Sequence, residues 1–381
     1  MKTQASDRLL FVLCCDRILI MKSQVKHTRK ITAVVAALSL ILLTLFCLFS
    51  SGCGYSIDYE YKIDYEGGEG YYVVSTSGNI TTMKGELEIP ATYGDGVPVK
   101  EIASEAFRGS GITKLVLPAT ITKVGVAAFA NCSRLEEVVF KEGIALEEIP
   151  KGMFGFDVCL TKMTIPDTVK TIGYRAFVGC ENLETVTLSQ NLETITEGAF
   201  EDCFALRDIT FPEGLVSIGS LAFYGCDLRE VIIPDSVHDT EITITDEEGN
   251  SQTQTVYGLD YGAFHTCRAL KKAVVGSGIT QIRAGVFGYC DSLEEIYIPL
   301  SVKKIEGAYF EGGKFISGHA FHNCNALATV NYAGTAADWG KIDINNEPHN
   351  DKSRLYNNSA LFKEANDKLN FNYNTSYTPS V

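Results

Sequence analysis

A phenylalanine recurs along the chain at intervals that are mostly 22 to 25 residues, and an aliphatic residue stands five positions before each one. After each phenylalanine, apolar and polar residues alternate over a short segment that often ends at a proline. This alternation predicts a β-strand with one buried face. The aliphatic-to-phenylalanine segment predicts a short helix or 3₁₀ turn. The nine phenylalanines are Phe107, Phe129, Phe154, Phe177, Phe200, Phe223, Phe264, Phe287 and Phe321.

One unit of this length cannot bury its own apolar edge, whereas stacked units can. The period therefore predicts a repeat solenoid in which strands of successive coils pair in parallel, about 4.8 Å apart. Two longer intervals, of 41 and 34 residues, indicate insertions near residues 235–257 and 306–316. The first insertion contains two alternating segments, Glu241–Thr245 and Thr253–Tyr257, which predict a β-hairpin.

The repeated unit, I-G-x-x-A-F-x-x-C-x-x-L-x-x-V-x-I-P, resembles the BspA-type leucine-rich repeat. The resemblance runs from Leu87 to Tyr332, and the segment Val330–Ile344 is similar to the closing segment of that family. It implies a right-handed superhelix with one short parallel strand and one short helix or 3₁₀ turn in each coil of about 23 residues. Proteins of this family are typically secreted or surface proteins that attach to host cells, matrix or other microbes, so the resemblance implies a binding function.

The N-terminus predicts export. A basic cluster at 22–30 precedes an uncharged apolar run, Ile31–Phe49, which is followed by Ser50, Ser51, Gly52 and Cys53. Ser-Gly-Cys resembles the lipobox of bacterial lipoproteins, which implies lipidation at Cys53, although Ser50 departs from the usual aliphatic residue. Two alternatives stay open. The run of 19 apolar residues could remain uncleaved and span a bilayer, or the signal could be cleaved and the protein secreted without an anchor. Met21 is the more usual start for such a signal, in which case residues 1–20 are not translated.

The chain thus divides into four segments. Residues 1–52 form the leader, and residues 53–82 form an acidic, tyrosine-rich tether that ends in a first cap strand at Tyr71–Ser75. Residues 83–334 form the solenoid with its insertions, and residues 335–381 form a C-terminal cap and frayed tail. We expect Trp339, the only tryptophan, to plug the open end of the core.

Charge and motifs argue against several functions. The net charge is −14, and residues 53–381 hold 26 basic and 45 acidic side chains, which disfavours nucleic-acid binding. The acidic cluster at 58–69 has no calcium-loop spacing. His319 and His322 could form a two-histidine site, but no third ligand is evident, and no HExxH, GxSxG or P-loop occurs. We therefore expect no catalytic residue, no metal and no cofactor. We also expect His265 and His322, next to repeat phenylalanines, to lie on the surface.

Eight cysteines follow the repeat phenylalanines, so an exported protein could pair them as disulfides. In-register coils place equivalent Cβ atoms about 4.8 Å apart, whereas a disulfide needs about 3.8 Å. Ser110 fills the same place in the first unit. We therefore predict a ladder of buried free thiols.

The outward strand positions form a candidate binding column, which is apolar for a solvent face: Val116, Val139, Thr164, Thr187, Thr210, Ile232, Val274 and Tyr297, with Asn331 after them. A recognition strip is one interpretation, and the β-propensity of these residues is the other.

Three functions are compatible with these features. The first is a surface-anchored protein that binds a host, matrix or microbial protein in adhesion. The second is a glycan-binding accessory lipoprotein, which needs an aromatic platform, although Tyr224, Tyr289, Tyr297 and Tyr309 are scattered within the repeat. The third is an enzyme, for which the repeats leave no segment long enough to form a catalytic domain.

Overall fold

The computed structural model describes residues 54–63, 70–245, 251–307, 309–311, 314–344 and 370–377. The unit Tyr55–Val381 is compact by itself, separate from Met1–Gly54. The predictions for the leader, for Cys53 and for the apolar run Ile31–Phe49 lie outside the described residues. Within the part that is described, no helix has the length and apolar character needed to cross a membrane.

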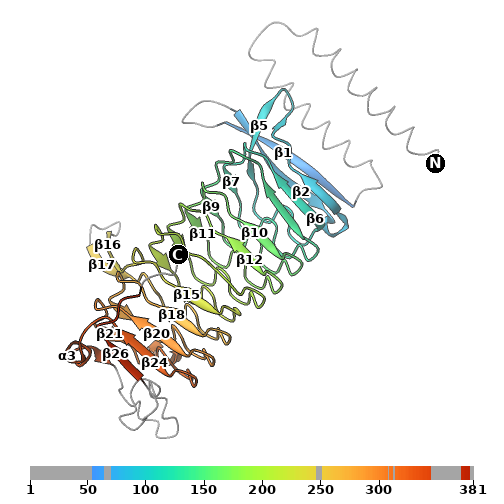
Figure 1. The fold of residues 1–381 in the computed structure, drawn as a ribbon. Helices are drawn as coiled ribbons and strands as arrows, with labels where there is room; N and C mark the ends of the chain where they lie inside the picture. The colour runs from blue at the N-terminus through green and yellow to red at the C-terminus, as the bar shows by residue number, and fades with distance from the viewer. Residues whose placement is uncertain are drawn as a thin grey trace, which may run out of the picture. The chain divides into compact units, whose positions relative to one another are not determined.

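The first strands of successive coils lie side by side and parallel (Figure 1), and where they pair, equivalent residues are mostly in register. These strands lie in three sheets, and the isolated bridge between Thr185 and Asp208 continues the pairing beyond β12. They are β3 (Lys84–Glu88), β6 (Gly111–Leu117), β8 (Glu137–Phe140), β10 (Lys162–Thr164), β12 (Thr185–Thr187), β15 (Glu230–Ile232), β18 (Lys272–Val274), β20 (Glu295–Ile298), β24 (Thr329–Tyr332) and β26 (Asn370–Tyr373). The repeat solenoid and its parallel strands are confirmed.

A second parallel ladder runs along another side of the coils. Its strands from β7 to β19 end at the aliphatic residue five positions before a repeat phenylalanine, whereas β21 ends at Ile305, ahead of the second insertion, and β25 lies in the C-terminal cap. The members are β5 (Val97–Ile102), β7 (Lys123–Val124), β9 (Glu148–Ile149), β11 (Thr171–Ile172), β13 (Thr194–Ile195), β14 (Ser217–Ile218), β19 (Gln281–Ile282), β21 (Lys304–Ile305) and β25 (Asp343–Ile344). Most coils therefore have two strands, and the segment that was expected to be a short helix or 3₁₀ turn is a strand end followed by hydrogen-bonded turns.

The backbone around each phenylalanine explains this correction. Arg175 and Gly179, two residues on either side of Phe177, have φ of 51° and 68°. A helix needs consecutive right-handed residues, so these left-handed positions prevent one. The amides instead alternate between their own coil and the next, because Ala176 donates to Gly173 while Phe177 donates to Ala199 at 2.8 Å. The described helices are the 3₁₀ turn η1 (Ile80–Thr82) and the single turn α3 (Ala336–Trp339).

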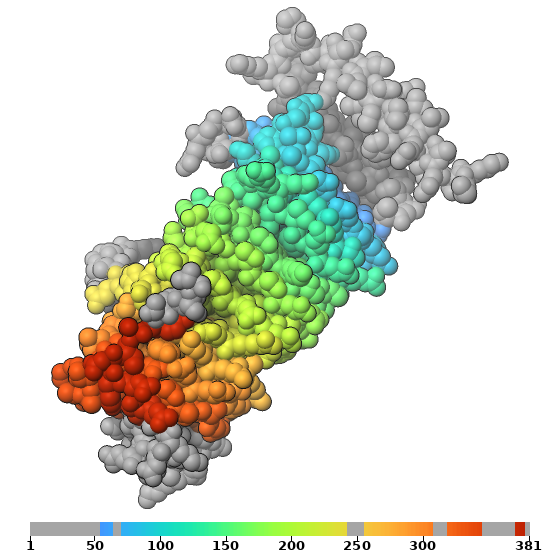
Figure 2. All heavy atoms as spheres, viewed as in Figure 1, coloured from blue at the N-terminus to red at the C-terminus, as the bar shows by residue number. Residues whose placement is uncertain are grey.

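The core is a continuous column of the repeat phenylalanines and the aliphatic residues beside them. All nine phenylalanines have no exposed surface. Neighbouring rings from Phe107 to Phe321 stack with centroids 5.1 to 6.1 Å apart. Such offset stacks add to the stabilisation that burial of the rings already provides. In Figure 2, the colours follow one another along the solenoid, because each coil lies next to the coil that follows it in the sequence.

The N-terminal cap corrects the tether prediction. β1 (Tyr55–Ile63) pairs antiparallel with β2 (Gly70–Gly78), and β2 pairs in parallel with β5. The predicted cap strand Tyr71–Ser75 lies within β2. β4 (Thr92–Tyr93) also pairs with β5. The residues before β2 are thus a strand of the cap over Tyr55–Ile63, and only Gly54 stands between Cys53 and that strand.

Both insertions contain antiparallel hairpins. In the first, the predicted hairpin is present as β16 (Thr240–Thr245) and β17 (Ser251–Val256). In the second, β22 (Tyr309–Glu311) pairs with β23 (Lys314–Ser317).

The C-terminal cap closes the last coil with aromatic rings. Trp339 packs edge-on against Tyr332 and Phe371, each with a centroid distance of 5.2 Å. Trp339 is only partly buried and lies against the end of the core. The predicted frayed tail is wrong for Asn370–Tyr373, because this segment is the strand β26 and pairs with β24 in parallel.

Candidate binding surface on the strand face

The candidate column is exposed only in the middle of the solenoid. Thr164, Thr187, Thr210 and Ile232 are exposed, and Val139 and Tyr297 are partly exposed. Val116 and Val274 are buried, with 4% and 5% of their surface exposed. The expectation of a continuous exposed strip is therefore wrong at these two positions.

Neighbouring side chains explain the two buried valines. Val116 lies in register between Glu88 and Val139, and the ion pair from Lys141 to Glu88, 3.8 Å long, reaches across β6 at this point. Val274 lies in register between the larger side chains of Ile232 and Tyr297. Neither valine belongs to the apolar core cluster, so both are covered on the strand face.

The adjacent column carries charges that pair between coils. Lys114 lies 3.2 Å from Glu137, and Lys272 lies 2.9 Å from Glu230. Partial burial lowers the pKa of Lys272, but the Glu230 carboxylate more than offsets this, so that the net shift is upward and the ammonium stays charged. Further along, Asn331 donates to Glu295 at 2.6 Å, and Asn372 donates to Asn331 at 2.8 Å. The face therefore has a polar flank fixed by contacts between coils.

The C-terminal segment returns to this face. After β26, Thr375 donates from its amide to the Tyr332 carbonyl at 3.2 Å. Two residues later, the Tyr377 ring packs against Tyr297, with centroids 5.2 Å apart, and lies 4.8 Å from the Lys272 ammonium. The ammonium is also 5.7 Å from the Tyr297 ring. Nothing in the local sequence pattern indicated this contact, because Tyr377 and Tyr297 are far apart along the chain.

The cysteine ladder is present, with seven members rather than eight. Each buried thiol donates to the carbonyl oxygen of the phenylalanine in the preceding coil, over 3.0 to 3.2 Å. Burial raises the thiol pKa values, to about 12 for Cys132 and Cys324, so these thiols are poor nucleophiles. Cys159 is exposed, and Asp157 takes its place in the ladder with no exposed surface. No disulfide forms among the described cysteines.

A second aromatic row lies at the turns that follow the phenylalanines. Tyr224 stacks on His265 at 5.5 Å, His265 contacts Tyr289 at 5.2 Å, and Tyr289 contacts His322 at 4.9 Å. The expectation that His265 and His322 are surface residues is wrong, because His265 is only partly exposed and His322 is buried. Burial, and then the nearby His322, lower the pKa of His265 to about 4. The structure thus brings together two of the four scattered tyrosines, Tyr224 and Tyr289.

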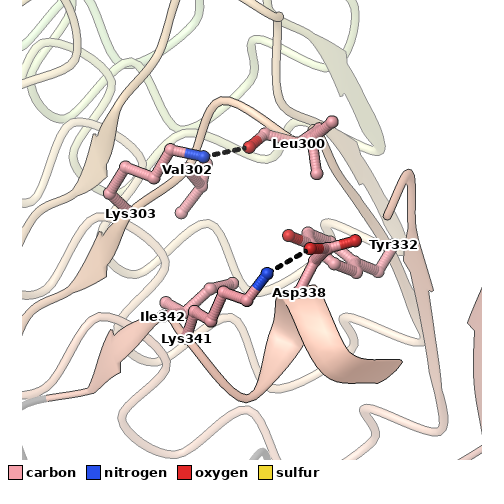
Figure 3. Close-up of a pocket in the computed structure, with 7 residues that line it drawn as sticks. All are labelled: Leu300, Val302, Lys303, Tyr332, Asp338, Lys341 and Ile342. Atoms are coloured by element: carbon pink, nitrogen blue, oxygen red, sulfur yellow. Dashed lines mark hydrogen bonds and ion pairs between the residues drawn. The ribbon is translucent and has the colours of Figure 1, made fainter. Parts of the chain in front are cut away.

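Two hollows on the described surface have volumes of about 290 and 450 Å³. Figure 3 shows a depression of about 290 Å³ beside α3, where Lys341 pairs with Asp338 at 2.9 Å and Lys303 donates to the Leu300 carbonyl at 2.9 Å. Its polar groups satisfy one another, which leaves no convergent set aimed at a ligand. Among the described residues, no group of three or more His, Cys, Asp or Glu side chains could hold a metal ion.

The repeats match a known family model, the BspA type leucine rich repeat region, in six copies over residues 100–155 and 144–244. The matched repeats are BspA-type leucine-rich repeats. Coils with the same two kinds of strand continue beyond the matched residues, through β18, β20 and β24 in one ladder and β19 and β21 in the other.

Solved structures of bacterial leucine-rich repeat proteins resemble this chain at low identity. A leucine-rich repeat protein from T. pallidum is 21% identical, over 62% of this chain and 78% of its own, with a TM-score of 0.34. One from Eubacterium ventriosum is 23% identical, over 64% and 59%, with a TM-score of 0.40. A leucine rich cell surface protein from Faecalibacterium prausnitzii is 23% identical, over 77% and 98%, with a TM-score of 0.31. No curated protein sequence matches the chain.

Proposed function

We propose that this protein is a non-catalytic binding protein of the cell surface, which attaches to proteins of a host, a matrix or another microbe through its strand face. The exposed run Thr164, Thr187, Thr210 and Ile232 carries the proposal. These residues stand at equivalent positions of successive coils and present short side chains of β-forming type. Solenoids use such extended surfaces for recognition, whereas catalysis usually needs an enclosed pocket.

Lipidation at Cys53 is the proposed anchor. Because β1 begins at Tyr55, only Gly54 would separate a lipid-bearing Cys53 from the folded cap. One residue spans at most about 3.6 Å, so the solenoid would start at the membrane surface, without a long tether. Labelled fatty acid should be incorporated into the wild type but not into Cys53→Ser. If the wild type takes up no label and still stays membrane-bound, the anchor is the apolar run Ile31–Phe49 instead.

Binding of the purified unit Gly54–Val381 to matrix proteins, mucin and host cells tests the strand face. Thr187→Arg and Thr210→Arg change exposed residues of this face, so we expect both to fold normally and to weaken saturable binding about tenfold, on the scale of an interface hot spot. Gln190→Arg is the matched control, because Gln190 is exposed in the turn that follows β12. Equal binding by all three variants would place the contact elsewhere.

Glycan capture is the second candidate, favoured by the row of Tyr224, His265 and Tyr289. Retention on polysaccharide, no binding to proteins, and loss of retention in Tyr289→Ala would support it over adhesion. The Tyr224 and His265 rings stack on each other at 11°, so they present edges rather than faces to a sugar, which is why protein binding is our first proposal.

A further inference from the structure

The contact of Tyr377 with the strand face identifies a specific subsite on it. Lys272, Val274 and Tyr297 lie on the adjacent strands β18 and β20, with Val274 and Tyr297 in register. The Tyr377 ring meets the Tyr297 ring at an interplanar angle of 64° and lies beside the Lys272 ammonium. An edge-to-face ring pair and a cation beside a ring are both attractive contacts. The subsite therefore has an aromatic wall and a fixed positive charge.

Contacts with neighbouring strands hold the subsite in place before anything binds it. Glu230 fixes the Lys272 ammonium at 2.9 Å, and the parallel pairing of β18 with β20 and of β20 with β24 fixes the backbone beneath Tyr297. A preorganised site loses little conformational entropy when it is filled. Lys162 occupies the equivalent strand position in the middle of the solenoid and is exposed. The strand after Lys162 carries Thr187 at the position where the strand after Lys272 carries Tyr297. The Tyr297 wall is thus specific to this end of the face.

We propose that Lys272 and Tyr297 form a subsite for an aromatic side chain presented by an extended peptide, and that Tyr377 of the same chain fills it in cis. The inference rests on the proposed function, and it names the partner class as a protein segment that carries an exposed tyrosine. A partner that uses this part of the face must displace residues 374–377. The intramolecular segment has an effective concentration on the order of millimolar. Only a partner that binds tightly, or at several sites at once, therefore displaces it.

The first test measures the contact in cis by hydrogen exchange on the unit Gly54–Val381, which contains the whole described core. Tyr297→Ala and Lys272→Met should speed exchange of the Asn374 and Thr375 amides, which donate to the Gly334 and Tyr332 carbonyls, by about tenfold, since one ring pair or cation–π contact is lost. Exchange in the coils around β10 and β12 should not change. Lys162→Met is the matched control and should leave the tail as protected as in the wild type. Unchanged protection of the tail in Tyr297→Ala overturns the proposal.

The second test supplies the ligand in trans as a fluorescent synthetic peptide with the sequence of residues 374–381. We expect Tyr377→Ala to bind this peptide at least tenfold more than the wild type does, because its subsite is empty. Adding Lys272→Met or Tyr297→Ala to Tyr377→Ala should remove that gain, and adding Lys162→Met should keep it. A peptide in which alanine replaces the tyrosine should not bind. Equal binding to wild type and Tyr377→Ala overturns the proposal.

These two tests need no host protein, so they separate this inference from the proposed function. Peptide binding to Tyr377→Ala in a protein that binds no matrix or cell surface would disprove adhesion and leave the subsite standing. Adhesion that depends on Thr187, combined with no tail contact and no peptide binding, would disprove the subsite and leave adhesion standing.

Discussion

The thiol of Cys180 donates a hydrogen bond to the carbonyl oxygen of Phe154 in the preceding coil, over 3.0 Å. The same carbonyl position accepts a thiol in coil after coil, so the cysteines connect the coils without covalent bonds. A small, weakly polar side chain suits the place because it satisfies a buried carbonyl at little desolvation cost.

We predict that thiol reagents distinguish Cys159 from the ladder. The ladder thiols are buried and their pKa values are raised, so they should not react with iodoacetamide at pH 7.5 in the folded protein, while exposed Cys159 should react. Mass spectrometry of the labelled unit Gly54–Val381 checks this, and unfolding in urea should expose all eight cysteines of residues 132–324. Labelling of Cys203 in the folded state at the rate of Cys159 would contradict a stable ladder.

Asp157 interrupts the cysteine ladder with a buried carboxyl group. Its Oδ1 accepts the Cys132 amide at 2.8 Å, while its buried Oδ2 has no hydrogen-bond partner among the described residues. Burial raises the pKa of Asp157 well above its usual value. An unpartnered buried polar atom costs roughly 1–3 kcal/mol. Asp157→Cys restores the repeat residue and removes this cost, but it also removes the acceptor of the Cys132 amide, so it should raise the free energy of unfolding by less than that amount.

The pH dependence of that gain follows from the direction of the pKa shift. The unfolded chain releases the Asp157 proton near pH 4, whereas the folded chain holds it, so the cost of Asp157 grows as the pH rises above about 4. Urea unfolding should show a larger gain for Asp157→Cys at pH 7 than at pH 4. Cys203→Asp is the matched control and should destabilise the protein with the same pH trend. A gain that is equal at both pH values would contradict a neutral buried acid.

The sequence predicted the period, the parallel strands and the first hairpin because these depend on which residues are apolar. It did not predict the second strand of each coil, because that strand exists only where the chain then turns through two left-handed residues. Glu105, Arg175 and Leu221 occupy the first left-handed position in their coils, and none of these residue types indicates a left-handed conformation. The outward, exposed positions of the strand column were predicted correctly at Thr164, Thr187, Thr210 and Ile232. The contact of Tyr377 with Tyr297 could not be predicted, because Tyr377 lies on a segment far away along the chain.

The left-handed turn predicts that substitution by alanine lowers the free energy of unfolding at Gly179 but not at Gly214. Gly179 has φ of 68°, and an added Cβ would lie 2.5 Å from Cδ1 of Phe156, whereas a Cβ on Gly214 would meet nothing within 4 Å. Gly179→Ala should lower the free energy of unfolding by about 1–2 kcal/mol or more, because the left-handed conformation alone costs that much. Gly214→Ala should be close to neutral. Thermal unfolding of both variants checks this, and equal melting temperatures would argue against the turn geometry.

The lowered pKa of His265 predicts a loss of stability in mild acid. The folded chain protonates this imidazole near pH 4, because burial and the adjacent His322 disfavour its charge, whereas the unfolded chain protonates it near 6.5. Its contribution is therefore fully present above about pH 6.5 and is lost as the pH falls toward 4, by roughly 3 kcal/mol at most. His265→Asn removes the titrating group, and urea midpoints between pH 7 and 4.5 should then decline less than in the wild type. His238→Asn changes an exposed histidine and serves as the control, which should follow the wild type. If the urea midpoint of His265→Asn declines as much as those of the wild type and His238→Asn, the acid sensitivity arises elsewhere in the solenoid.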